Sequence, residues 1–249
     1  RTGRQGDAKS ALSLIGTDTL QGDECHISIE GVDAEQAFLR ISTFIKDEFP
    51  HCDAPLPQSS ESQEEALPQS LTHLNPNVIR ARSVCGGIAQ GILLRLSTMD
   101  LKHLGELPAS RGVEEEQGAL DLGLSRLLKS LDLQLLDDNG TTSAVLEAHR
   151  SLLSDHSLRA QILEQIVKGA SCAQAIVAAE EHFCQQFSSS ASEYLRERAL
   201  DVRDVCFQLL QQIYGSQRFP SQTALQQSSI CMADELTPSQ FLELDKSLL

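Results

Sequence analysis

SASEYLRERALDVRDV, residues 190–205, is the stretch that decides the fold of this chain, because it combines a helix start, a charged face and an apolar stripe. Ser190 and Glu193 stand at the spacing of a capping box, in which a hydroxyl and a carboxylate bind the first free backbone amides of a helix. Apolar residues then recur in alternating steps of four and three, at Leu195, Ala199, Val202, Cys206, Leu209 and Ile213. This period predicts a long, partly buried helix over residues 190–213.

Helical periodicity extends outward from this stretch over most of residues 113–215. Apolar residues are spaced for helices in four further segments: 120–136, 143–153, 158–167 and 173–187. Turn-forming residues separate these segments, at Asp138-Asn139-Gly140, Ser154-Asp155 and Lys168-Gly169. We therefore expect a bundle resembling four helices, with at least one of them broken into two.

The segments around the bundle have the patterns of a mixed α/β structure. Residues 78–96 contain two apolar runs around a Gly-Gly turn, which predicts a hairpin whose first strand ends at Cys85. Residues 229–233 favour a strand, and residues 239–244 favour a short helix. Residues 50–76 are rich in Pro, Ser, Gln and Glu, which is typical of a linker.

The N-terminal segment, residues 1–49, alternates between helical and strand patterns. Residues 8–20 favour a helix, and the apolar residues Cys25, Ile27 and Ile29 alternate with polar ones as in a strand. We expect Asp33 to cap a second helix over residues 34–49. That helix has one apolar stripe, formed by Ala37, Phe38, Ile41, Phe44 and Ile45. We expect the stripe to cover a sheet, and the segment alone to be marginally stable because it is so small.

Composition excludes several classes of protein. A hydrophobic content of 41% in 249 residues suffices to bury the cores of one or two domains. No apolar run approaches the roughly 20 residues of a membrane span and no signal pattern opens the chain, so we expect a cytoplasmic protein without membrane insertion. The formal charge of -15 argues against a nucleic-acid partner, since such proteins need a basic surface.

The cysteines and histidines do not have the spacing of a metal site. The seven cysteines are widely spaced and include no C-x-x-C pair, and several fall at apolar positions, so we expect buried, inert thiols. His149 and His156 are separated by two helical turns, which is too far for one shared ion. We therefore expect no metal site.

Three segments carry a resemblance to a known family. They are YLRERALDVRD at residues 194–204, VIRARSVCGGIAQGILL at residues 78–94 and ADELTPSQ at residues 233–240. They resemble the helical arm of Enzyme I, the phosphoenolpyruvate-protein phosphotransferase of bacterial sugar transport, its opening strands around S-P-G-I-A-x-G, and its A-x-D-L-T-P-S segment. Cys85 and Gly86 stand here in place of Ser-Pro.

A fourth segment resembles HPr, the small phosphocarrier protein, in its second half. It is DAKSALSLIGTDTLQGD, residues 7–23, followed by CHISIEG. An HPr-like half joined to an Enzyme I-like half is the layout of the multiphosphoryl transfer proteins of fructose-like systems. The resemblance implies an α+β, mostly α fold: a partial HPr-like αβ unit, a linker, and an Enzyme I N-terminal region with a helical HPr-binding bundle inserted in an incomplete α/β body. The implied boundaries are 1–49, 50–77, 78–110, 111–215 and 216–249.

The two active histidines of the family have no match in the chain. The G-L-H-x-R-P loop of HPr would precede Arg1, and the G-G-R-T-S-H-T signature of Enzyme I would follow Leu249. The resemblance therefore implies a fragment with no catalytic residue and no cofactor, inactive by itself and monomeric. In the full-length family, Mg²⁺ and phosphoenolpyruvate bind in a C-terminal domain that also forms a dimer.

By resemblance, the parent protein passes a phosphoryl group from phosphoenolpyruvate through an Enzyme I-like and an HPr-like histidine to a sugar-specific IIA domain in sugar uptake. The partners would be an HPr-like phosphocarrier domain, its own or a separate one, and the IIA domain. This chain would supply the docking of the carrier. Two alternatives stay open: a non-catalytic helical scaffold or regulatory module that binds another partner, and a complete regulator that ends at Leu249.

Residues 148–158, AHRSLLSDHSL, resemble the family's G-H-x-x-L-L-x-D-x-x-L, the helix break that docks HPr. The implied docking residues are His149, Leu152, Leu153, Asp155 and Leu158. Judged from the residues alone, the leucines fit a bundle core and Asp155 fits a cap of the next helix equally well. Ser10 stands where some HPr proteins carry a regulatory phosphorylated serine, although capping of a helix by Asp7 or Ser10 is the interpretation we favour.

Overall fold

A computed structural model describes residues 3–19, 22–51, 86, 89–96, 101, 106–137, 142–188, 193–220 and 225–249. The chain divides into two compact units, one of Arg1–Asp23 with Ala89–Leu249 and one of Glu24–Ile88. The fold is mostly helical with a small parallel sheet, which confirms the predicted α+β, mostly α class. Among the described residues, no helix is both long enough and apolar enough to cross a bilayer.

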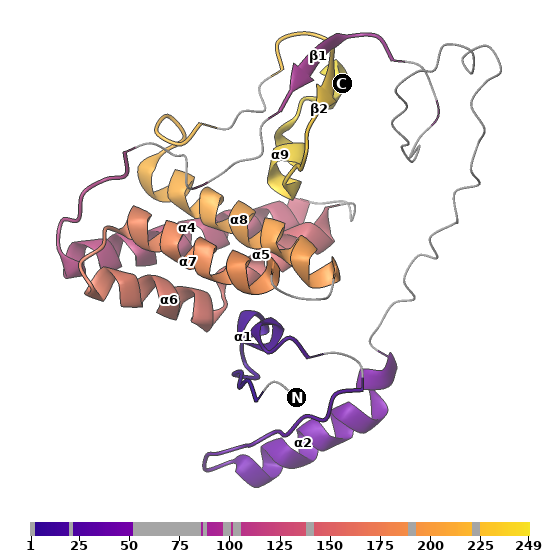
Figure 1. The fold of residues 1–249 in the computed structure, drawn as a ribbon, viewed down its shortest axis with the longest axis vertical. Helices are drawn as coiled ribbons and strands as arrows, with labels where there is room; N and C mark the ends of the chain where they lie inside the picture. Colours follow the sequence, from indigo (N-terminus) through magenta and orange to yellow (C-terminus); the bar gives the residue numbers. More distant parts are fainter. Residues whose placement is uncertain are drawn as a thin grey trace. The chain divides into compact units, whose positions relative to one another are not determined.

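A helical bundle forms most of the larger unit (Figure 1). Its helices are α4 (Val113–Asp137), α5 (Ser143–Leu153), α6 (His156–Val167), α7 (Cys172–Ser188) and α8 (Glu193–Tyr214). The bounds of α5, α6, α7 and α8 agree with the predicted segments to within three residues, because their apolar period is continuous. Helix α4 begins earlier than predicted, since its first turn carries Glu114, Glu115 and Glu116, whose charge is favourable at a helix N-terminus.

The apolar stripe of α8 lies in the bundle core, as its period predicts. Val202, Cys206 and Leu209 are almost completely buried, and Ile213 packs against them at the edge of the core. The predicted capping box lies outside the description, because Ser190 and the side chain of Glu193 are not described. The packing of α8 thus follows from its pattern alone.

The sheet of the larger unit pairs strands that are far apart in the sequence. Strand β1 (Ile92–Arg95) runs parallel to β2 (Ser229–Met232), with Ile92 opposite Ser229. The first strand of the predicted hairpin lies outside the described residues. Helix α9 (Pro238–Glu243) follows β2 and starts with a complete capping box between Thr237 and Gln240. A short 3₁₀ turn, Lys246–Leu248, comes after it.

The N-terminal segment contributes to both units. Helix α1 (Ala11–Gly16) belongs to the larger unit and is shorter than the predicted helix over residues 8–20. In the smaller unit, α2 (Ala34–Asp47) leads into a 3₁₀ turn, Phe49–His51. Asp33 occupies the N-cap position of α2, but its side chain forms no capping hydrogen bond, contrary to the prediction. The strand predicted around Ile27 is wrong, because a strand needs a hydrogen-bonded neighbour and none of the described residues pairs with this segment.

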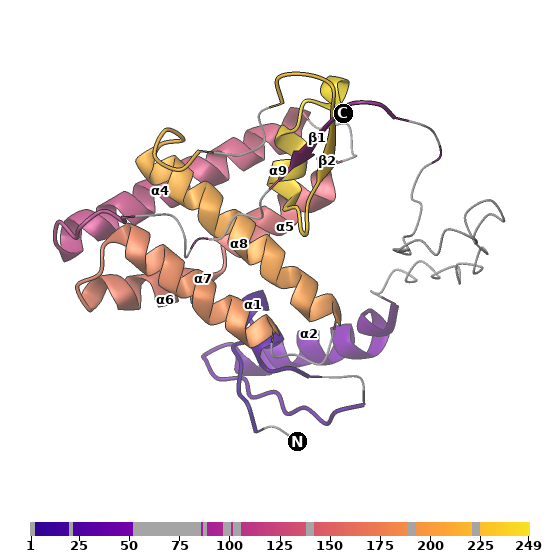
Figure 2. The ribbon, with the colours of Figure 1, turned by 45° about the horizontal axis from the view of Figure 1, so that its top comes forward.

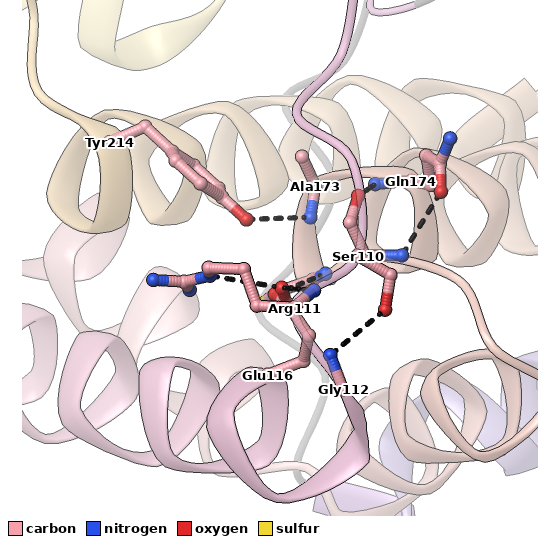
Figure 3. A network of polar contacts seen from close by, with 9 residues as sticks. Ser110, Arg111, Gly112, Glu116, Ala173, Gln174 and Tyr214 are labelled. Carbon is pink, nitrogen blue, oxygen red and sulfur yellow. Dashed lines mark hydrogen bonds and ion pairs between the residues drawn. The ribbon is translucent and has the colours of Figure 1, made fainter.

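The starts of α4 and α7 are joined by a polar network (Figure 3). The carboxylate of Glu116, 1% exposed, accepts hydrogen bonds from the backbone N of Cys172 (2.8 Å) and of Arg111 (3.0 Å), and from Nε of Arg111 (3.2 Å). The hydroxyl of Tyr214 on α8 accepts from the backbone N of Ala173 (3.1 Å). Side chains of α4 and α8 thereby bind amides at the N-terminus of α7, which would otherwise lack partners.

Thiols of the bundle are buried, as the apolar positions of several cysteines predicted. Burial raises the pKa of Cys172 and of Cys184 to about 12, and raises that of Cys206 well above its ordinary value. Such thiols stay protonated at neutral pH and are therefore poor nucleophiles and metal ligands. No group of His, Cys, Asp and Glu residues in the described part of the chain is arranged to hold a metal ion.

Candidate docking site

The α5–α6 break, formed by Ser154 and Asp155, is the centre of the candidate site. Ser154 ends α5 in a helical conformation, and Asp155 turns the chain with an extended backbone at φ -70° and ψ 122°. One carboxylate oxygen of Asp155, Oδ1, accepts from the backbone N of Ser157 at 2.8 Å, so the residue caps α6. The predicted capping role is therefore present.

Asp155 also binds the start of α1, which precedes it in the sequence by more than 140 residues. Oδ1 of Asp155 accepts from the hydroxyl of Ser10 at 2.7 Å, and Oδ2 accepts from the backbone N of Leu12 at 3.0 Å. Ser10 and Leu12 are both 0% exposed. Three donors from two segments therefore converge on one buried carboxylate, the arrangement in which charge-assisted hydrogen bonds are strongest.

Weaker contacts surround this centre. Oδ2 of Asp7 lies 2.9 Å from Nε2 of His156, and each side chain is about half exposed. A hydrogen bond from the backbone N of Lys9, together with the contact to His156, lowers the pKa of Asp7. Gly16, at the end of α1, lies close to the side chain of Gln186 on α7. Both views place α1 beside the ends of α6 and α7 (Figures 1 and 2).

Three of the predicted docking residues, all leucines, are parts of the hydrophobic core. Leu153 and Leu158 are buried, and Leu152 is partly buried against the same core. Leu12 of α1 belongs to this core as well. The predicted regulatory residue, Ser10, caps α1 by accepting from the backbone N of Ser13 at 2.9 Å, in addition to its bond with Asp155.

His149 lies on α5 but its polar neighbours are on α8. It is 1% exposed, with Nε2 3.5 Å from Oδ2 of Asp204 and Nδ1 3.3 Å from Nε2 of Gln208. Among the described residues, its Nε2 has no hydrogen-bond partner. Burial lowers the pKa of His149 and raises that of Asp204, because each charged form has lost its water.

The same polar cluster reaches α9. Oδ2 of Asp204 accepts from the backbone N of Ser239 at 2.8 Å, and Nε2 of Gln208 donates to the hydroxyl of Ser239 at 2.5 Å. Sequence reasoning missed these contacts and also Leu12, since nothing in the charged face of α8 distinguishes Asp204 from its neighbours. His149 therefore joins α5 to α8, and its α8 partners in turn bind α9, whereas Asp155 contacts α1.

Comparisons with known proteins agree with the order of these segments. The family described as PTS HPr component phosphorylation site matches residues 1–47, and the family described as PEP-utilising enzyme, N-terminal, matches residues 80–198. Ser10 and Leu12 thus fall in the first match, and Asp155 falls in the second.

Relatives of known name cover most or all of the chain. Multiphosphoryl transfer protein 2 of Escherichia coli K12 is 61% identical to this chain, over 100% of this chain and 30% of its own length. Multiphosphoryl transfer protein 1 of the same organism is 35% identical, over 98% of this chain and 29% of its own length. A phosphoenolpyruvate-protein phosphotransferase of Mycoplasma capricolum is 22% identical over 65% of this chain and 28% of its own length. The chain thus spans less than a third of these relatives. It is a homologue of multiphosphoryl transfer protein 2, with an HPr segment followed by an Enzyme I N-terminal segment, in the phosphotransferase-system family of phosphoryl transfer proteins.

Proposed function

We propose that the α5–α6 break docks an HPr-like phosphocarrier. The docking residues are Leu152, Leu153, Asp155 and Leu158, together with His149 on the preceding helix α5, whose side chain contacts Asp204 and Gln208 of α8. The observation that carries this proposal is the contact of Asp155 with Ser10 and Leu12, because those two residues belong to the part of the chain that matches the HPr family. A carboxylate that accepts a serine hydroxyl and a helix-start amide fits the first turn of a capped helix.

The apolar residues around Asp155 support the same role. Leu12 is fully buried beside it, so the contact combines a desolvated carboxylate with apolar packing. Interfaces of this kind derive their energy from a few buried groups, while exposed pairs such as Asp7 with His156 contribute little.

In the parent protein, this dock serves a phosphoryl relay from phosphoenolpyruvate through an Enzyme I-like and an HPr-like histidine to a sugar-specific IIA domain. Holding the phosphoryl-donating and phosphoryl-accepting histidines in line lowers the activation barrier of such a transfer by several kcal/mol. The chain itself carries neither active histidine and is inactive alone. Phosphoenolpyruvate and Mg²⁺ act in another domain of the parent, which is a cytoplasmic dimer, whereas this chain is a monomer.

The test is a titration of an isotope-labelled, complete HPr protein with this chain, followed by NMR up to millimolar carrier. We expect carrier resonances to shift around its active-site histidine, and the shifts to weaken with Leu152→Ala and to vanish with Asp155→Lys. Glu164→Lys is the matched control: it makes the same charge change on α6, at a side chain that is more than half exposed and pairs with Lys168.

Equal shifts for Asp155→Lys and Glu164→Lys would overturn the assignment of the dock. Absence of shifts with every form of the chain would favour the alternative, a helical scaffold that binds a different partner. Both outcomes are meaningful only if the variants are folded. The helical circular dichroism signal of each variant checks this.

A further inference from the structure

We infer that the dock of this chain is occupied by the chain's own segment around α1, so that a separate phosphocarrier binds only by displacing it. This inference rests on the proposed docking function and adds its occupant and its regulation. The occupying segment is defined here as residues 7–17, from Asp7 to the C-terminal cap of α1.

The carboxylate of Asp155 has no oxygen left without a donor. Asp155 is 6% exposed, and its two oxygens already accept from Ser10, Leu12 and Ser157. A second helix start cannot form the same bonds while Ser10 and Leu12 remain in place. Displacement of α1 is therefore a condition for any equivalent contact with another protein.

The occupying segment also packs against the bundle through α1. Leu12 is part of the same buried core as Leu153 and Leu158. A Cβ atom added at Gly16 would lie 3.1 Å from Oε1 of Gln186 on α7, so the C-terminal end of α1 is close to that helix. Leu14 on the same helix is 46% exposed. One face of α1 is thus inserted into the bundle, while the other faces solvent.

The occupying segment and the dock belong to one chain, which raises the local concentration of the segment at the dock. Two parts of one chain meet at an effective concentration in the millimolar range, so even a modest affinity keeps the site filled. The apparent affinity for a separate carrier is then reduced by the fraction of molecules in which the site is open.

A release variant with a matched control tests the inference in the full chain. Leu12→Asp places a carboxylate in the core beside Asp155 and expels α1, whereas Leu14→Asp adds the same charge to the exposed face. Titrated with a complete, separate HPr protein, Leu12→Asp should bind at least tenfold more tightly than the unmodified chain, and Leu14→Asp should bind as the unmodified chain does. Leu12→Ala is a milder release variant should Leu12→Asp not fold, and its affinity should lie between the two.

The outcomes separate the two claims. If the release variants and the unmodified chain bind the carrier equally well, occupation by α1 is wrong and the dock remains. If none of the folded forms binds the carrier, including the released ones, the docking function itself is wrong, and the inference falls with it.

Discussion

At the scale of single residues, Glu116 is a buried carboxylate that joins the starts of α4 and α7. Burial would raise its pKa, but the hydrogen bonds from Cys172 and Arg111 outweigh burial and lower the pKa below the ordinary value of 4.5. A lowered pKa in the folded state stabilises the fold above pH 4.5. That stabilisation is lost as the pH falls through the folded-state value, because the unfolded chain then binds the proton more readily.

Replacement of this residue, Glu116→Gln, should therefore lower the free energy of unfolding at neutral pH by about 1–3 kcal/mol, the usual loss when buried donors lose a charged acceptor. The same variant should show a smaller decline in stability than the unmodified chain when the pH is lowered below 4.5. Denaturant unfolding at several pH values measures both effects. Glu115→Gln, at an exposed position of the same turn, is the control, and an equal loss in both variants would contradict the prediction.

At the scale of elements, two glycines of α4 separate the effect of helix packing on stability from the effect of helix propensity. Gly123 faces α8 so closely that a Cβ atom there would overlap Cγ1 of Ile213, whereas Gly118 has no atom within 4 Å of such a Cβ. Gly123→Ala should destabilise the chain by about 1–3 kcal/mol through overpacking. Gly118→Ala should stabilise it by about 0.5–1 kcal/mol, because alanine loses less backbone entropy in a helix.

The midpoints of chemical denaturation check this pair of glycine variants. We expect Gly123→Ala to lower the denaturation midpoint and Gly118→Ala to raise it, although both replace a glycine of α4 with alanine. If both variants gained stability, α4 and α8 would not be in the close contact described here.

At the scale of the whole molecule, Asp155 connects segments that lie in different family matches. Asp155→Asn keeps an oxygen that can cap α6, but its amide group cannot accept from the backbone N of Leu12 while the oxygen serves Ser157. Hydrogen exchange at Leu12 should then accelerate about tenfold or more, in line with the 1.5–3 kcal/mol typical of a hydrogen bond to a charged group.

The amides of α6 should keep their protection in the Asp155→Asn variant, as measured by hydrogen exchange resolved by residue. Asp7→Asn, which removes only the half-exposed pair with His156, should leave the exchange of Leu12 nearly unchanged. Unchanged exchange at Leu12, together with loss of protection throughout α6, would mean that Asp155 acts only as a helix cap.

Local signals determined much of this architecture. The helix over residues 143–153 was predicted with its observed bounds, because its apolar period and the Ser154-Asp155 turn both act within a few residues. The cap on α6 was also predictable, since a cap needs only an acceptor next to a free amide. The strand predicted around Ile27 from its alternation is absent from the described part of the chain, because alternation within a segment does not supply the neighbouring strand that pairing requires.

The sequence by itself determined the bundle helices, their buried stripes and the resemblance to the HPr and Enzyme I segments. Only the tertiary structure decided which residues meet: Ser10 and Leu12 with Asp155, and His149 with Asp204. The physical reason is that helix period and caps depend on neighbours three or four residues away, whereas these contacts join residues at least 55 positions apart. No local pattern records such a contact, because its energy arises only after the chain has packed.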